Sequence, residues 1–144
     1  MGANIYKSLS VLVVDDQEFV LKIVTTILTQ IGFNEIRTAE DGTAAVAAVE
    51  SALPDLIVCD INMKPMDGLA FLKRLRNNDS AKVRKIPLMF LTGEFSQELV
   101  EEATDLGCNS FLLKPVSPKK MREKIDDIFD TVISMGEDVE AAQD

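Results

Sequence analysis

The stretch that decides the fold reads SVLVVDD over residues 10–16. Five mostly apolar, β-branched residues lead directly into two aspartates. An apolar run of this length without alternation is typical of a strand buried on both faces of a parallel sheet. Two further runs have the same character, DLIVC over residues 55–59 and IPLMFL over residues 86–91. Shorter, mixed segments over residues 35–38 and 110–113 predict two more strands, nearer the sheet edges.

Helical periodicity fills the intervals between these strands. Apolar side chains recur at steps of three and four residues, which is the pattern of a helix with one buried face. The pattern covers residues 19–31, 43–52, 69–75, 99–106 and 121–133. Five strands that alternate with five helices predict an α/β fold with a doubly wound parallel sheet.

Length and charge narrow the class of protein. The 144 residues, 47% of them hydrophobic, suit one domain. With 15 basic and 24 acidic residues the net charge is −9, which disfavours binding to nucleic acid or to an anionic lipid surface. Two cysteines without zinc spacing, no signal peptide and no apolar run of membrane length predict a protein of the reducing cytoplasm. The chain has no histidine, which excludes a Ser-His-Asp or Cys-His mechanism and a histidine-rich metal site.

Polar residues collect where the predicted strands end. Asp15 and Asp16 follow the first strand, Asp60 the third, Thr92 the fourth and Lys114 the fifth. Ligands of doubly wound sheets bind outside the carboxyl ends of the strands. We therefore expect these five side chains to meet at one edge of the sheet.

Such a cluster suits a metal ion and a phosphoryl group. Crowded carboxylates stay ionised only beside a cation, and oxygen ligands without His or Cys select Mg²⁺ or Mn²⁺. Mg²⁺ typically combines one or two carboxylates with phosphate oxygens, which Thr92, Lys114 and backbone amides can also hold. The nucleophile is then a carboxylate, and Asp60, at the end of the central strand, is the best candidate to form an aspartyl phosphate.

Five short motifs, in their order and spacing, resemble the receiver domain of bacterial two-component response regulators, in particular the single-domain chemotaxis type. The resemblance covers residues 9–134 and leaves residues 135–144 as an acidic tail that we expect to be disordered. It also implies a flavodoxin-like strand order of 2-1-3-4-5. The motifs are VLVVDD (residues 11–16), PDLIVCDINM (54–63), MDGL (66–69), LTG (91–93) and LLKP (112–115).

The resemblance assigns roles around the acids. Asp60 resembles the phosphoacceptor, which a phosphohistidine on a partner protein charges. Asp15 and Asp16 resemble the acid pair that holds Mg²⁺, with Asp16 the expected direct ligand. Asp60 and the backbone carbonyl of Asn62 would complete the metal ligands. Asn62 also lies, with Glu94, at positions where the family tunes hydrolysis of the phosphoaspartate.

Other matching residues correspond to the family's phosphate contacts and switch. Lys114 resembles the lysine that contacts the phosphoryl group. Thr92, followed by Gly93, resembles the switch hydroxyl, and Phe111 resembles the switch aromatic. In the family, phosphate draws in the hydroxyl and the aromatic ring turns inward behind it, which shifts an existing equilibrium.

The implied function is that of a single-domain response regulator in a phosphorelay, which catalyses only its own phosphorylation and dephosphorylation. The implied phosphodonor is a sensor histidine kinase or a histidine phosphotransfer protein. A downstream protein would bind the face made by the fourth and fifth predicted helices and the fifth strand. We expect a monomer or weak dimer that binds neither nucleic acid nor membrane directly.

Three alternatives stay open at this point. The chain could be a phosphohydrolase of the haloacid dehalogenase type, but Asn62 stands where that family has its acid. It could also be a pseudo-receiver without phosphorylation, or one part of a larger regulator or hybrid kinase. Two positions depart from the receiver pattern, because Lys64 stands where proline is common and Val116 where phenylalanine is frequent. Phe111 is as readily a core residue as a switch.

Overall fold

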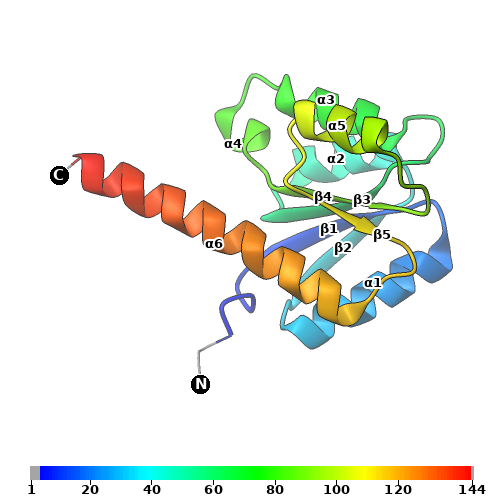
Figure 1. The fold of residues 1–144 in the computed structure, drawn as a ribbon, viewed down its shortest axis with the longest axis horizontal. Coiled ribbons are helices and arrows are strands. Elements are labelled where there is room, and N and C mark those ends of the chain that lie inside the picture. The colour runs from blue at the N-terminus through cyan, green and yellow to red at the C-terminus, as the bar shows by residue number, and fades with distance from the viewer. Residues whose placement is uncertain (1–3, 144) are drawn as a thin grey trace.

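A five-stranded parallel sheet covered by helices on both faces forms the computed structural model (Figure 1). The structure describes residues 4–143, and the side chains of residues 4–130. The strands are β1 (Ser10–Val14), β2 (Glu35–Ala39), β3 (Leu56–Asp60), β4 (Leu88–Thr92) and β5 (Ser110–Leu113). The helices are α1 (Glu18–Ile31), α2 (Gly42–Ser51), α3 (Gly68–Arg76), α4 (Ala81–Arg84), α5 (Gln97–Asp105) and α6 (Pro118–Gln143).

The strand order is β2-β1-β3-β4-β5, which confirms the predicted doubly wound, flavodoxin-like sheet. All pairs are parallel, so the carboxyl ends of the strands share one edge. In the register, Val14 pairs with Cys59 and Asp60 pairs with Leu91. The residues after β1 and at the ends of β3 and β4 therefore lie next to one another.

Two hydrophobic cores lie on opposite faces of this sheet. Val11 and Val13 of β1 contribute to the core under α1 and α6. Leu12 and Val14 contribute to the core under α2, α3 and α5. Because β1 is covered on both faces, its apolar residues run without alternation, as the sequence predicted.

The prediction of five helices was wrong by one. The additional helix, α4, has four residues and no buried side chain, and lies between α3 and β4. A single turn is too short to show helical periodicity, so no pattern in the sequence indicated it. At the other end, helical backbone continues to Gln143, past the predicted domain boundary at residue 134. The division into a domain over residues 9–134 and a disordered tail over residues 135–144 stays a prediction.

Short polar side chains fix the starts of the helices that follow β2, β3 and β4. The side chains of Asp41, Asp67 and Ser96 accept hydrogen bonds from backbone N–H groups three residues further on, at 2.8, 2.8 and 3.1 Å. Each bond satisfies a donor that the first turn of a helix leaves unpaired. Within residues 4–143, none of the helices combines the length and apolarity that crossing a membrane requires.

Candidate functional site

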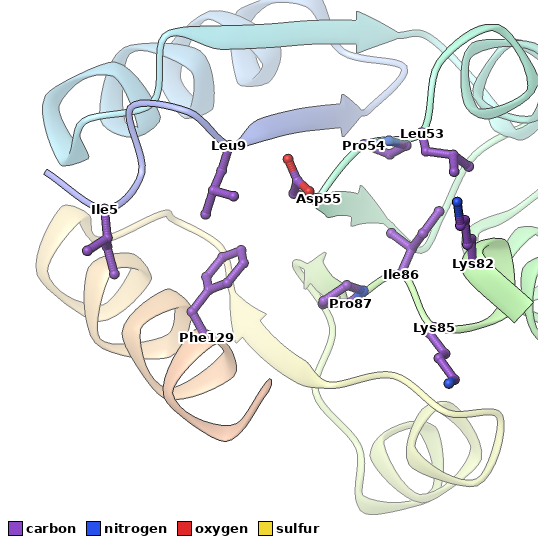
Figure 2. A pocket seen from close by; sticks show the side chains of 10 residues that line it. All are labelled: Ile5, Leu9, Leu53, Pro54, Asp55, Lys82, Lys85, Ile86, Pro87 and Phe129. Atoms are coloured by element: carbon purple, nitrogen blue, oxygen red, sulfur yellow. The ribbon is translucent and has the colours of Figure 1, made fainter. Parts of the chain in front are cut away.

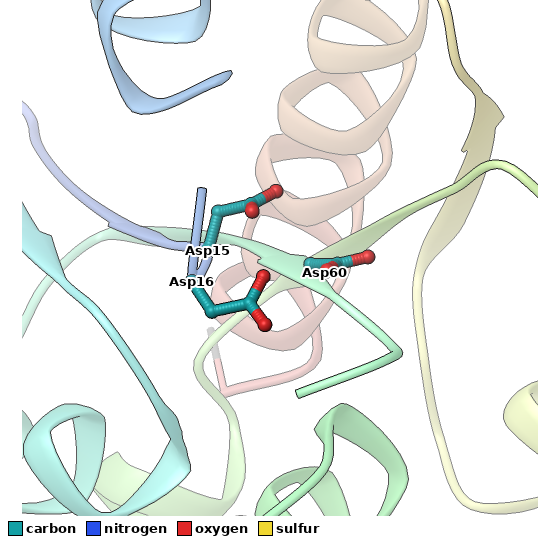
Figure 3. A group of neighbouring side chains, drawn as sticks. All are labelled: Asp15, Asp16 and Asp60. Carbon is teal, nitrogen blue, oxygen red and sulfur yellow. The ribbon is translucent and has the colours of Figure 1, made fainter. Parts of the chain in front are cut away.

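Three carboxylates converge at the carboxyl ends of β1 and β3 (Figure 3). Asp15 and Asp16 follow β1 directly, and Asp60 is the last residue of β3. One oxygen from each of the three lies within 4.8 Å of the other two. Asp15 and Asp60 are buried, whereas Asp16 is exposed to solvent. The cluster is thus anchored in the sheet and open on one side.

Lys114 supplies the positive charge that lies among these acids. Its Nζ atom is 3.1 Å from Asp15 Oδ2 and 3.4 Å from Asp60 Oδ1. The backbone places it there, because the Lys114 N–H extends the β4–β5 ladder by donating to the Thr92 carbonyl at 2.8 Å. One ammonium group therefore faces two buried carboxylates, and the acid cluster keeps an excess of negative charge.

This excess changes the acidity of Asp60. Burial raises the pKa of its carboxyl group above the ordinary value, and the nearby Asp15 charge raises it further. Lys114 and a hydrogen bond from the backbone N–H of Asn62 act in the opposite direction on that pKa. A divalent cation beside the three carboxylates would favour the ionised form. The donor set, which is oxygen only and more negative than its lysine can balance, fits a hard cation such as Mg²⁺.

The side of the site nearest β4 and β5 carries the predicted switch residues. Thr92 is buried at the end of β4, and its Oγ1 accepts a hydrogen bond from the Glu94 N–H at 3.1 Å. Gly93 is exposed, and a Cβ atom on it would meet nothing within 4 Å. Phe111 is half-buried on β5 against the core of α2, α3 and α5. Thr92 thus lies on the strand next to that of Asp60, and the exposed Gly93 follows it.

The contacts join four of the predicted residues directly, namely Asp15, Asp16, Asp60 and Lys114. Asn62 and Glu94 have exposed side chains in the loops after β3 and β4. The roles predicted for these two residues, and for Thr92, Gly93 and Phe111, stay predictions.

Two supporting residues escaped the sequence analysis. The backbone N–H of Gln17 donates to Asp15 Oδ1 at 2.9 Å and so orients that carboxylate. A Cβ atom on Gly68 would collide with the backbone carbonyl of Asp60 and lie 2.9 Å from the Cα of Ile61. Gly68 belongs to the MDGL motif, but its close approach to Asp60 depends on tertiary packing.

Comparison with known proteins agrees with this fold. A family model for the response regulator receiver domain matches residues 11–126. Chemotaxis protein CheY-3 of Vibrio cholerae serotype O1 is 33% identical over 130 residues, which are 90% of this chain and 98% of the relative. The structure of Vibrio cholerae CheY4 crystallised at low pH has a TM-score of 0.77 at 32% identity, and covers 83% of this chain and 98% of that one.

A second solved structure is that of a complex. The CheX–CheY–BeF3–Mg²⁺ complex from Borrelia burgdorferi has a TM-score of 0.78 at 30% identity, and covers 84% of this chain and 89% of that one. The match of the family model extends over most of the chain, including β1, β3, β4 and β5 with their polar ends. The chain therefore belongs to the response regulator receiver domain family.

Proposed function

We propose that this chain accepts a phosphoryl group on Asp60 from a sensor histidine kinase or a histidine phosphotransfer protein. Response regulators with receiver domains are signalling proteins rather than classical enzymes. The observation that supports the proposal most directly is the position of Lys114 between Asp15 and Asp60, with Asp16 beside them. A nucleophile, a cation site and a phosphate-binding ammonium group then share one edge of the sheet.

The cation in this proposal is Mg²⁺, with Mn²⁺ as a substitute. The carboxylates of Asp15, Asp16 and Asp60 and the backbone carbonyl of Asn62 would hold it, with Asp16 as the direct ligand that solvent reaches most easily. When bound, it neutralises charge on the phosphoryl oxygens. The CheY of the Borrelia burgdorferi complex is described together with Mg²⁺.

The chemical step belongs to the Asp60 carboxylate. One of its oxygens forms a bond to phosphorus while the N–P bond of the donor phosphohistidine breaks, and the electron pair of that bond returns to the imidazole nitrogen. Lys114 has three N–H donors and is already within 3.4 Å of Asp60, so it donates to a phosphoryl oxygen after modest movement. In hydrolysis, water attacks the same phosphorus while its bond to the Asp60 oxygen breaks, which releases phosphate and restores the carboxylate. Asn62 and Glu94 would set the rate of this step from the two flanking loops.

Thr92 would couple phosphorylation of Asp60 to a conformational change in the rest of the molecule. Its hydroxyl oxygen accepts from Glu94, which leaves the hydroxyl hydrogen free to donate to a phosphoryl oxygen. Phe111, half-buried on the adjacent strand, would turn inward behind the hydroxyl. Phosphorylation would thereby shift the equilibrium between two existing conformations of the surface, without creating a new conformation.

The output surface in this proposal is the face made by α5, β5 and α6. Two apolar side chains are exposed in this region, Phe95 before α5 and Leu113 at the end of β5, at 66% and 45% exposure. Both flank residues of the switch, so a change at Thr92 or Phe111 alters a surface that a protein target can bind. Location in the cytoplasm stays a prediction of the sequence.

Intact-protein mass spectrometry after treatment with acetyl phosphate and Mg²⁺ tests this function. We expect one added phosphoryl group on the natural chain and none on Asp60→Asn. A matched control is Asp79→Asn, since Asp79 is exposed and outside the acid cluster, and it should gain one group. The proposal fails if Asp60→Asn is still phosphorylated. It also fails if the natural chain stays unmodified by both acetyl phosphate and a phosphorylated histidine phosphotransfer protein.

A further inference from the structure

A groove lies at the edge of the sheet opposite the acid cluster. Leu9, Asp55 and Pro87 line it, and they directly precede β1, β3 and β4. The groove therefore follows the amino ends of the strands. Its volume is about 550 Å³ and most of its lining is apolar. None of the residues of the proposed phosphorylation site lines this groove.

The two walls of the groove differ in character. Figure 2 shows Ile5 and Phe129 of α6 on one side, and Lys82 of α4 and Lys85, the next residue after α4, on the other. Ile5 is 53% exposed and Phe129 is buried, so the apolar wall is open to solvent at Ile5. One wall thus offers apolar contact and the other offers positive charge.

The charge of the second wall is unusual for this chain. Residues 73–85 contain six basic residues and one acidic residue, although the net charge of the whole is −9. Lys82 and Lys85 are exposed, and among residues 4–130 neither has a carboxylate within ion-pair distance. The acid in the groove, Asp55, already accepts hydrogen bonds from the Ser10 N–H at 2.8 Å and the Ser10 hydroxyl at 3.3 Å. The groove therefore fits a ligand that is both apolar and acidic.

Helix α6 continues beyond the sheet at this same edge (Figure 1). The residues after Asp130 add about 20 Å of helix. The buried stripe of α6 reaches Ile128 and Phe129, and its spacing of three and four residues continues in the sequence at Val132, Met135 and Val139. Such a spacing is the pattern of a helix that packs on a partner.

The same segment carries the complementary charge. No basic residue follows Lys124 in the sequence, and residues 131–144 contain four acids, namely Glu137, Asp138, Glu140 and Asp144. The end of α6 is thus amphipathic and acidic, which matches the apolar and basic walls of the groove. A nucleic acid or lipid headgroup would match only the basic wall.

We propose that the acidic end of α6 from a second copy of this chain binds in the groove. In Figure 1 the helix runs straight away from its own domain, so it reaches a neighbouring copy more readily than its own groove. In a dimer with a twofold axis, the end of α6 of each copy binds in the groove of the other copy. The two contacts are identical, and both grooves are filled. The dimer joins Lys82 and Lys85 of one copy to the acids of the other, and it does not require phosphorylation.

Charge reversal on the full chain tests this exchange by sedimentation equilibrium. Lys82→Glu with Lys85→Glu, and separately Glu137→Lys with Glu140→Lys, should each raise the dimer dissociation constant at least about tenfold at about 50 mM salt. An equimolar mixture of the two variants should dimerise like the natural chain, because both contacts are then complementary. The rescue also shows that each variant is folded.

Matched controls separate this contact from general charge effects. Lys119→Glu with Lys120→Glu and Glu101→Lys with Glu102→Lys change the net charge equally at exposed positions outside the groove, and should dimerise normally. Asp60→Asn should also dimerise normally, so failure of the phosphorylation proposal leaves this result unchanged. A natural chain that stays monomeric at high concentration overturns the exchange, as does a mixture that shows no rescue; either result would indicate an intramolecular contact or a different acidic partner.

Discussion

At the scale of single residues, the site contains more negative than positive charge, and its charged side chains are positioned by the ends of the strands. Asp15 and Asp60 are buried at adjacent strand ends, and Lys114 is shared between them. Taking a carboxylate out of water disfavours its ionised form unless a counter-charge is close. This cost falls at the place where we propose that a cation and a phosphoryl group bind.

The raised pKa of Asp60 makes stability depend on pH in a defined direction. When the pH lies between 3.8, the ordinary pKa of this carboxyl group, and its raised pKa in the folded chain, the folded chain binds more protons than the unfolded chain. The stability that this carboxyl group contributes is complete below pH 3.8 and is lost as the pH rises through the folded pKa. In urea unfolding between about pH 4 and pH 8, Asp60→Asn should gain stability relative to the natural chain as the pH rises.

Two comparisons check this assignment. Asp79→Asn, which removes an exposed carboxyl group outside the acid cluster, is the matched control and should not reproduce the gain in stability expected for Asp60→Asn. Added Mg²⁺ should raise the stability of the natural chain at high pH more than that of Asp60→Asn. If the stabilities of the natural chain and of Asp60→Asn depend on pH in the same way, groups other than Asp60 cause that dependence.

At the scale of elements, loops and helix ends position the site as much as the strands do. The N–H of Gly68, at the start of α3, donates to the Ile61 carbonyl at 2.8 Å and closes the loop after Asp60. The closure brings the Gly68 Cα against the backbone of Asp60, where no side chain fits. Helix α3 therefore packs behind Asp60, the proposed phosphoacceptor.

Replacing this glycine should disturb both stability and the site. Gly68→Ala should lower the free energy of unfolding by about 1–3 kcal/mol, because the backbone of β3 or α3 must move. Its Mg²⁺ affinity should fall as well, measured by calorimetric titration. Gly93→Ala is the matched control, since its Cβ meets nothing within 4 Å, and its stability should change by less than about 0.5 kcal/mol. Equal losses in the two variants would contradict the contact at Gly68.

Arg76 joins the elements that follow α3. Its guanidinium donates to the carbonyls of Gly107, Arg84 and Ile86 at 2.8 to 3.1 Å, and to Asn109 Oδ1 at 3.1 Å. One side chain thus satisfies the end of α4, the start of β4 and the turn after α5. The guanidinium of Arg76 is charged and partly buried. Each hydrogen bond that it donates to these carbonyls is therefore stronger than one between neutral groups in water.

Loss of that guanidinium should loosen the α4 region. We expect Arg76→Met to lower the free energy of unfolding by about 2–4 kcal/mol, and to speed amide hydrogen exchange over residues 80–88. Arg74→Met, at an exposed position two residues away without such bonds, should change stability by less than about 0.5 kcal/mol. Arg76→Met with protection equal to that of the natural chain would show that packing alone holds α4.

The same elements mark what sequence alone can predict. Strands and long helices follow from hydrophobic period, and the site acids follow from their place at strand ends. The four-residue α4 is too short to show a helical period, and the side chain of Arg76, from α3, holds its last residue through the Arg84 carbonyl. The Gly68 contact and the Gln17 hydrogen bond to Asp15 arise when distant segments pack, so no local pattern reveals them.

At the scale of the whole molecule, the N-terminal segment ties the start of the chain to α6. The Tyr6 ring stacks on Phe33 with centroids 4.8 Å apart and meets Phe129 edge-on at 5.6 Å. Its hydroxyl donates to the carboxylate of Asp126. The contact covers one side of the core under α1 and α6 and places Ile5 at the groove.

Tyr6 also provides a probe of this contact, because the chain has one tyrosine and no tryptophan. Burial raises the pKa of its phenol above the ordinary value of 10, and the hydrogen bond to Asp126 and that residue's charge raise it further. In a titration followed by tyrosinate absorbance, Asp126→Asn should therefore lower the pKa of Tyr6. Asp127→Asn is the control and should leave it unchanged. An equal Tyr6 pKa in all three proteins would place the ring elsewhere.

The acid cluster and the groove lie at opposite ends of the same strands, about 17 Å apart for strands of this length. Recognition between copies and receipt of a signal are therefore separable in design. Reversing the charges at Lys82, Lys85, Glu137 and Glu140 together would produce a variant that dimerises with itself and does not bind the natural chain. Under the proposed function, both proteins would still accept a phosphoryl group from the same donor.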